Sequence, residues 1–230
     1  MSENVLLRGI VGSTAYGLAG PHSDVDRLGV FAVPTVALHG LHPPKESVVD
    51  HDPQDVTMHE AGKFCRLALS CNPTAMELLW LPDDLFEVRT ELGDELIGIR
   101  SAFLSAPRVR DAFLGYADQQ FTRLINKEAS RDGGRWSDRR TAKHARHMLR
   151  LIDQGLGLYE TGVLTIRLAD PQRYLDFGEE VAADPQAARP ELDRAREGFA
   201  SATTVLPERP DEEPAERWLL RVRAFYFRET

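Results

Sequence analysis

Residues 5–33 read VLLRGIVGSTAYGLAGPHSDVDRLGVFAV, and this stretch decides the fold. Its first seven residues, 5–11, are mostly apolar, which is typical of a buried strand. Three Gly or Pro residues within 14–23 predict a turn with a short helix. Residues 25–33 alternate between polar and apolar and then become apolar, so they predict a second strand beside the first.

The apolar pattern changes period after residue 58, from two residues to about 3.6. Residues 47–58 predict one strand or a hairpin kinked at Pro53. A short strand is expected at 163–168 and loops at 131–135 and 178–190. Helices are expected from 59 to 71, from 73 to 80, near 90–100, at 108–128, at 142–161, at 190–204 and at 212–228.

This outline predicts an α+β fold. A mixed sheet of four or five strands with flanking helices comes first, and a helical C-terminal half follows it. We expect one domain at residues 1–90 and a second, mainly helical domain at 91–230.

Composition limits the function classes. The 230 residues carry a net charge of −8, which argues against a general nucleic-acid coat. Residues 131–150, however, hold seven Lys or Arg against two Asp, so a local basic face can serve one phosphorylated ligand. Sparse cysteines, Cys65 and Cys71, and the absence of a leader or a long apolar run predict reduced thiols in a cytoplasmic protein that spans no membrane.

Two carboxylates stand at the start of the second strand. On a strand, residues i and i+2 share a face, so Asp24 and Asp26 are expected side by side, with Val25 turned to the core. Two such carboxylates repel each other unless a cation lies between them. Carboxylate oxygens suit Mg²⁺, with Mn²⁺ as a substitute, and a pair of such ions can hold the attacking and leaving oxygens of a phosphoryl transfer.

The Gly12-Ser13 break after the first strand supplies a phosphate site. Glycine lets the backbone approach a phosphate closely, and backbone N–H groups with the Ser hydroxyl can bind its oxygens. Asp-x-Asp alone or Gly-Ser alone is common and most often structural. In this order, each at its own strand, the two motifs are far more specific.

The combination resembles the signature of the DNA polymerase β superfamily of nucleotidyltransferases, and most closely its RNA-repair-associated, RlaP-like branch. The resemblance covers about residues 5–168. It rests on the following segments: GSTAYGL at 12–18, SDVDRLGV at 23–30, DVTMHE at 55–60, KF at 63–64, RLAL at 66–69, NP at 72–73, ELLW at 77–80, and Lys143, His147 and Arg150-Leu151.

The resemblance implies a third carboxylate on a neighbouring strand, which completes the metal site and accepts a proton. We place it at Asp55, because Asp55 precedes a strand-like segment that runs directly into a helix. Asp50 and Asp52 remain rivals. Glu60 lies at the start of that helix, where a capping role is expected.

Two further segments carry weaker predictions. Asn72 should cap the helix that begins at Pro73, whereas Glu77 is either paired internally or faces the active site. Lys143, His147 and Arg150 step by four and three, so they form one helical stripe beside the apolar one. This stripe is either a solvated basic face or, as the resemblance implies, a site for the phosphates of the nucleotide or acceptor, with His147 orienting the two cations.

The resulting hypothesis is an Mg²⁺-dependent enzyme that moves an NMP from ATP or another NTP to a hydroxyl, with an RNA end as the expected acceptor. The alternatives are nucleotidylation of a protein, as in toxin–antitoxin systems, or of a small molecule. A catalytically inactive binding module is disfavoured by the intact carboxylates. The sequence leaves the preferred base, the acceptor and the oligomeric state open.

Overall fold

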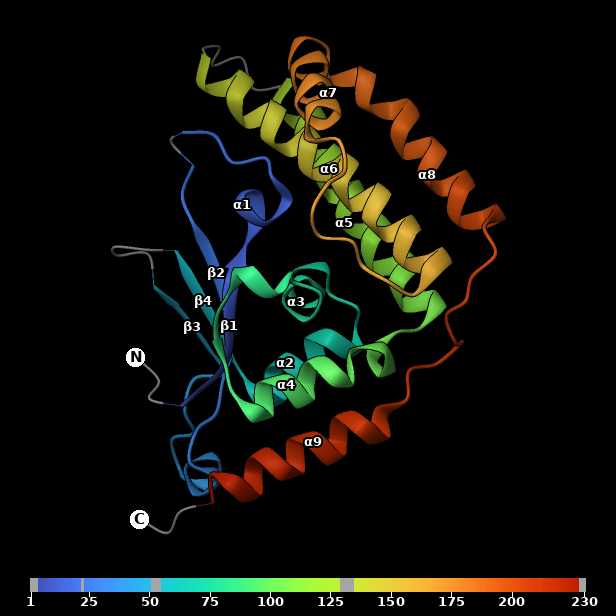
Figure 1. Cartoon of the computed structure of the whole chain (residues 1–230). Coiled ribbons are helices and arrows are strands. Elements are labelled where there is room, and N and C mark those ends of the chain that lie inside the picture. Colours follow the sequence, from blue (N-terminus) through green and yellow to red (C-terminus); the bar gives the residue numbers. More distant parts are fainter. Residues whose placement is uncertain (1–3, 22, 51–54, 129–134, 228–230) are drawn as a thin grey trace. The chain divides into compact units, whose positions relative to one another are not determined.

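The computed structural model describes residues 4–21, 23–50, 55–128 and 135–227. By internal contacts the chain divides into two units. The first comprises residues 1–105 and 209–230, and the second comprises residues 106–208. The elements of both units are drawn in Figure 1.

The first unit is built on one mixed sheet of five strands in the order β3-β4-β2-β1-β5. β2 pairs antiparallel with β1 and parallel with β4. This sheet confirms the predicted fold class, and the pairing of β3 with β4 selects the hairpin over a single strand. The strands are β1 Val5–Val11, β2 Asp26–Phe31, β3 Ser47–Asp50, β4 Val56–Glu60 and β5 Phe86–Arg89.

The helices of this unit lie on one side of the sheet, apart from a short 3₁₀ segment (Figure 1). Leu7, Leu28 and Val30 are fully or almost fully buried on the helix side. A Cβ on Gly93 would lie 2.4 Å from the carbonyl oxygen of Leu6, so the glycine lets a helix approach β1 closely. The helices are α1 Gly12–Tyr16, α2 Ala61–Leu69, α3 Pro73–Leu79, α4 Glu91–Gly98 and α9 Glu212–Phe225, with 3₁₀ segments η1 Thr35–His39, η2 Asp83–Leu85 and η3 Arg100–Phe103.

The opposite side of the sheet has a smaller apolar cluster. Phe31, Val33 and Met58 are buried there, and Leu38 of η1 packs against them. The two sides of β2 therefore differ. Even-numbered residues such as Leu28 face the helices, and odd-numbered residues such as Phe31 face the small cluster.

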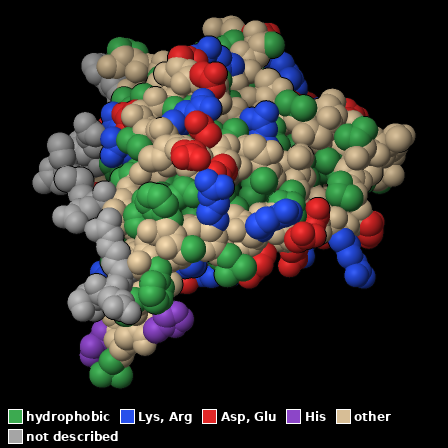
Figure 2. All heavy atoms as spheres, turned by 60° about the horizontal axis from the view of Figure 1, so that its bottom comes forward, with side chains coloured by type: hydrophobic (Ala, Val, Ile, Leu, Met, Phe, Trp, Pro, Cys, Tyr) green, Lys and Arg blue, Asp and Glu red, His purple; other side chains and the backbone are tan. Residues whose placement is uncertain are grey.

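The C-terminal helix α9 belongs to the first unit. Trp218 donates its indole N–H to the carbonyl of Leu92 at 2.8 Å, and Thr35 donates its hydroxyl to the carbonyl of Arg223 at 2.6 Å. Arg223 also forms an ion pair with the buried Glu60. The charged face around α9 carries acidic and basic side chains interspersed (Figure 2).

The second unit is helical. Gly155 of α6 lies against Phe113 of α5, where a Cβ would be 2.7 Å from the phenylalanine Cβ. Gly162, with φ +73°, directly follows the last residue of α6, a position where glycine commonly ends a helix. The helices are α5 Ala106–Glu128, α6 Arg135–Thr161, α7 Pro171–Ala183 and α8 Arg189–Ser201, with a 3₁₀ segment η4 Pro185–Ala188.

Three local expectations differ from the structure. No strand forms at 163–168, because these residues have no strand partner among the described residues. Residues 178–183 belong to α7 rather than to a loop, since the buried Tyr174, Gly178 and Val181 extend its apolar face through the Ala-rich segment. The domain boundary predicted near residue 90 falls inside the first unit, and helix α9 also belongs to that unit. The predicted loop at 131–135 lies largely outside the described residues.

Among the described residues, no helix is long and apolar enough to cross a membrane.

Candidate functional site

Gly12 and Ser13 form the first residues of α1, directly after β1. Gly12 has φ +70°, a left-handed conformation that favours glycine. A Cβ at Gly12 would lie 2.5 Å from Oδ2 of Asp26. The turn therefore touches the carboxylate, and the absence of a side chain at residue 12 makes this approach possible.

Asp26 is the first residue of β2 and pairs with Val11, the last residue of β1. Asp24 is exposed and precedes the strand. The expectation that Val25 turns to the core is wrong, because its side chain is 38% exposed. The strand pairing stops at Asp26, where β1 ends and the chain turns into α1, so Asp24 and Val25 extend past the sheet.

Asp55 lies next to Asp26 across the sheet. Arg27 pairs with Val56 in the parallel register of β2 and β4, so the residues before them, Asp26 and Asp55, are neighbours. The Arg27 amide donates to the carbonyl of Asp55 at 2.8 Å, which fixes this end of the pairing. Alternation along β2 places Asp26 on the helix side of the sheet, and the backbone of Asp55 lies beside it at this end of the sheet.

The rival carboxylates occupy other positions. Asp50 pairs with Val56, and Val56 pairs with Arg27, which places Asp50 on the face opposite Asp26. Asp52 lies outside the described residues. Glu60 caps α2, because its carboxylate accepts from the amide of Gly62 at 2.8 Å, and its ion pair with Arg223 occupies it further. The predicted capping role of Glu60 is confirmed.

The donor set suits a hard cation that arrives with a phosphorylated substrate. In the described part of the chain, no three His, Cys, Asp or Glu side chains form a ready-made metal cluster. Mg²⁺ commonly binds one or two carboxylates and completes its shell with water and substrate phosphates. The adjacent Asp26 and Asp55, with Gly12 beside them, fit that mode, whereas a site for a metal held by protein alone would need more donors.

A buried contact holds α1 in place. The hydroxyl of Tyr16 donates to the carboxylate of Glu77 on α3, and both side chains are buried. Asn72 caps α3 as predicted, accepting from the amides of Thr74 and Ala75. Glu77 is therefore paired internally, the first of its two expected roles. The motifs predict no role for Tyr16, although its place one turn after Gly12 is a usable signal.

The basic stripe lies on α6 of the second unit. Lys143 is exposed, His147 is partly buried, and Arg150 is only 3% exposed. Arg150 donates to the amide oxygen of Gln154 at 2.5 Å and lies 3.4 Å from the Nε2 of His147. The stripe thus runs from solvent into the interior, which is more than a solvated basic face.

Positive charge surrounds His147. Burial, followed by the charges of Arg150, His144, Lys143 and Arg123, lowers the pKa of His147 to about 3. The ring is therefore neutral at physiological pH. Arg123 comes from α5, so two helices contribute to this cationic site, and no periodicity within α6 could have shown that contribution. Such a concentration of positive charge attracts a phosphorylated ligand.

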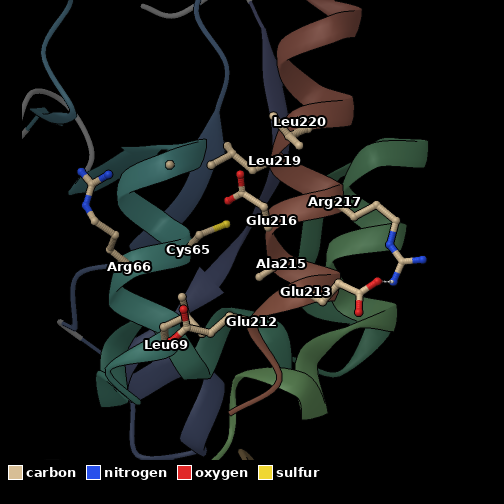
Figure 3. Close-up of a pocket in the computed structure, with 11 residues that line it drawn as sticks. Cys65, Arg66, Leu69, Glu212, Glu213, Ala215, Glu216, Arg217, Leu219 and Leu220 are labelled. Carbon is tan, nitrogen blue, oxygen red and sulfur yellow. Dashed lines mark ion pairs between the residues drawn. The ribbon is translucent and has the colours of Figure 1, made fainter. Parts of the chain in front are cut away.

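A separate groove lies between α2 and α9, with a volume of about 670 Å³ (Figure 3). It contains none of Gly12, Asp24, Asp26 and Asp55. Burial, with the charge of Glu60, raises the pKa of its Cys65 thiol to about 12, so this cysteine stays protonated at neutral pH. The groove is apolar with a mixed charged rim, unlike a phosphate site. Its lining residues are Gly62, Cys65, Arg66, Leu69, Glu212, Glu213, Ala215, Glu216, Arg217, Leu219 and Leu220.

A mixed sheet with a Gly-Ser turn against Asp26 is the arrangement of a polymerase β-like nucleotidyltransferase. A comparison with protein-family models supports this class: the chain belongs to the RlaP family, the RNA repair pathway DNA polymerase beta family, which matches residues 2–182. Helices α8 and α9 follow the matched range. A search of curated proteins finds no match.

Proposed function

We propose that this protein is an Mg²⁺-dependent nucleotidyltransferase that moves an NMP from an NTP to the hydroxyl of an RNA end. The observation that carries the proposal is the convergence of Gly12, Asp26 and Asp55. Gly12 lies in the turn after β1, Asp26 is the first residue of β2, and Asp55 directly precedes β4, where the strand register sets it beside Asp26.

Each residue has a distinct task in this proposal. The amide groups of Gly12 and Ser13, with the Ser13 hydroxyl, bind oxygens of the triphosphate. Asp24, Asp26 and Asp55 hold the divalent ions, which neutralise the developing charge and align the reacting oxygens when bound. Asp55 accepts the proton of the acceptor hydroxyl. That oxygen forms a bond to the α-phosphorus, the bond from the α-phosphorus to the bridging oxygen breaks, and pyrophosphate leaves.

Lys143 and Arg150 are proposed to bind phosphates of the nucleotide or of the acceptor. Arg150 is held by Gln154, and Gln154 in turn donates to the carbonyl of Thr165 at 2.8 Å. This network gives the guanidinium a fixed direction, which favours binding of a defined phosphate over loose attraction.

An RNA acceptor is supported by the family, whose description places it in an RNA repair pathway. The net charge of −8 fits an enzyme that holds one end rather than a long duplex. Cytoplasmic location is proposed on the two sparse cysteines, Cys65 and Cys71, read as reduced thiols.

Incubation with each α-labelled NTP, Mg²⁺ or Mn²⁺, and either total RNA or cell lysate tests the proposal. We expect label in RNase-sensitive material with the wild type and none with Asp26→Asn. Asp50→Asn is the matched control, because it removes one carboxylate from the other face of the sheet. Label in protease-sensitive material would replace the RNA acceptor with a protein. No labelled product with any NTP would overturn the transferase activity.

A further inference from the structure

Arg27 follows Asp26 directly but points to the other side of the sheet. Alternation along β2 places Asp26 on the helix side and Arg27 on the side of Gly29 and Phe31. Its side chain is only 15% exposed. Arg27 is therefore a mostly buried charged residue on the face of the sheet opposite Asp26.

Two hydrogen bonds connect Arg27 to the segments that carry the carboxylates, and a third connects it to β5. Its amide donates to the carbonyl of Asp55 at 2.8 Å. Its Nη1 donates to the carbonyl of Val25 at 3.2 Å, and its Nε donates to Oε1 of Glu87 at 2.7 Å. One residue thus joins the peptide between Asp24 and Asp26, the segment before β4, and strand β5.

Glu87 is the anchor of this arrangement. Its other carboxylate oxygen accepts from Nε of Arg8 at 3.0 Å, so one carboxylate ties together β2, β1 and β5. Partly exposed ion pairs of this kind contribute little to the stability of a fold. The geometry that they fix is a better explanation for a shared carboxylate at this position.

The segment before Asp26 needs another support because the pairing of β1 with β2 does not extend to it. β1 ends at Val11, opposite Asp26, so Asp24 and Val25 lie beyond the last β1–β2 pair. The segment of Asp24 and Val25 therefore lacks the β1–β2 pairing that holds Asp26.

We propose that Arg27 is a positioning residue that holds the backbone of Asp24–Asp26 beside Asp55 from the reverse face of the sheet, with Glu87 orienting its guanidinium. The metal-binding consequence rests on the proposed function. The backbone consequence does not, because it concerns the protein alone.

Four proteins test this: wild type, Arg27→Ala, Arg27→Lys and Arg8→Ala. Arg8→Ala is the matched control, since it removes the other guanidinium from Glu87 and leaves the bond to Val25. Thermal unfolding should show small, similar losses for both alanine variants. Hydrogen exchange of the metal-free protein at residues 23–27 should be about tenfold faster in Arg27→Ala and unchanged in Arg8→Ala.

Transfer kinetics give the second readout. Arg27→Ala should raise the half-saturating Mg²⁺ concentration about tenfold with a smaller change in kcat, whereas Arg8→Ala should leave both near the wild-type values. Arg27→Lys keeps a charge for Glu87, but one ammonium cannot reproduce the fork that reaches both partners. We expect wild-type thermal stability with a raised Mg²⁺ requirement.

The outcomes separate the two proposals. Equal hydrogen exchange in Arg27→Ala, Arg27→Lys and Arg8→Ala overturns the positioning role, whatever the activity. Faster exchange in the Arg27 variants, with a wild type that transfers no nucleotide, supports the backbone role and rejects the transferase activity. Faster exchange with an unchanged Mg²⁺ requirement rejects the link between the backbone and metal binding.

Discussion

The sheet end of the first unit and the basic stripe of α6 differ in how their residues are brought together. At the sheet end, Gly12 comes from a turn, Asp26 from the start of β2 and Asp55 from the residue before β4, and the pairing of the strands brings them together. On α6, Lys143, His147 and Arg150 meet because a helix repeats about every 3.6 residues. The first arrangement depends on the tertiary fold, and the second is present in any helix with this sequence.

The two regions also differ in burial. Asp24 is exposed and Asp26 and Asp55 are partly exposed, as expected for groups that bind an ion arriving from solvent. Arg150, by contrast, is buried against Gln154. Substitutions at the sheet end should therefore act on catalysis, and those at the inner part of the α6 stripe should also act on stability.

The largest effect is expected at Asp26. Asp26→Asn keeps the shape and removes the charge, so nucleotidyl transfer should fall by about 10³-fold or more, several kcal/mol in the barrier. Asp55→Asn should abolish transfer but leave Mg²⁺-dependent NTP binding largely intact. Initial rates and calorimetric titration measure the two effects. Full activity of both Asp24→Asn and Asp26→Asn would show that the assigned carboxylates are wrong.

Gly12→Ala should have the next largest effect, on stability. A left-handed φ and a Cβ 2.5 Å from the Asp26 carboxylate together should cost about 3 kcal/mol of unfolding free energy. Gly157→Ala on α6 is the comparison, because nothing lies within 4 Å of its added Cβ and alanine should stabilise that helix by about 0.5–1 kcal/mol. Denaturant unfolding measures both, and equal effects would contradict the close approach at Gly12.

His147 should make stability depend on pH. The pKa of His147 is about 3 in the folded protein and 6.5 for an exposed histidine. Between these pH values the unfolded state therefore binds a proton at this residue and the folded state does not. The free energy of unfolding is therefore not reduced by His147 above pH 6.5, and it decreases as the pH falls from 6.5 toward 3. His147→Gln should remove about 2 kcal/mol of the difference in unfolding free energy between pH 7 and pH 4.5. An unchanged difference in His147→Gln would contradict the neutral, partly buried state of this ring.

The smallest effect is expected at the exposed end of the stripe. Lys143→Ala should weaken Mg²⁺–NTP or phosphorylated-acceptor binding about fivefold, near 1 kcal/mol, and leave the thermal midpoint unchanged. Arg139→Ala, which removes another exposed cation from α6, should change binding less. Equal losses of binding in the two variants would mean that Lys143 acts only through the general electrostatic attraction of α6 for phosphate.

Sequence predicted most of the sheet because the evidence was local. The apolar run at 5–11 and the turn residues after it define β1 and α1 almost residue for residue. Asp55 could be selected from its place before a strand, but the register that sets it beside Asp26 joins segments about thirty residues apart and has no local signal. The roles of all the predicted site residues remain predictions.

The misses have the same origin. Arg27 carries no motif signal for positioning, since its partners Val25, Asp55 and Glu87 are found only once three strands are aligned. Val25 was expected in the core because alternation was extended past the last paired residue. The return of α9 to the first unit was equally invisible, because an amphipathic helix shows that it packs but not where.

That return affects the order in which the chain can fold during synthesis. The whole second unit, residues 106–208, is made before α9, so it can fold while the first unit still lacks its last helix. Until Arg223 arrives, Glu60 has no guanidinium partner at a position that is 4% exposed in the finished protein. The first unit is therefore complete only after residue 223 has been synthesised.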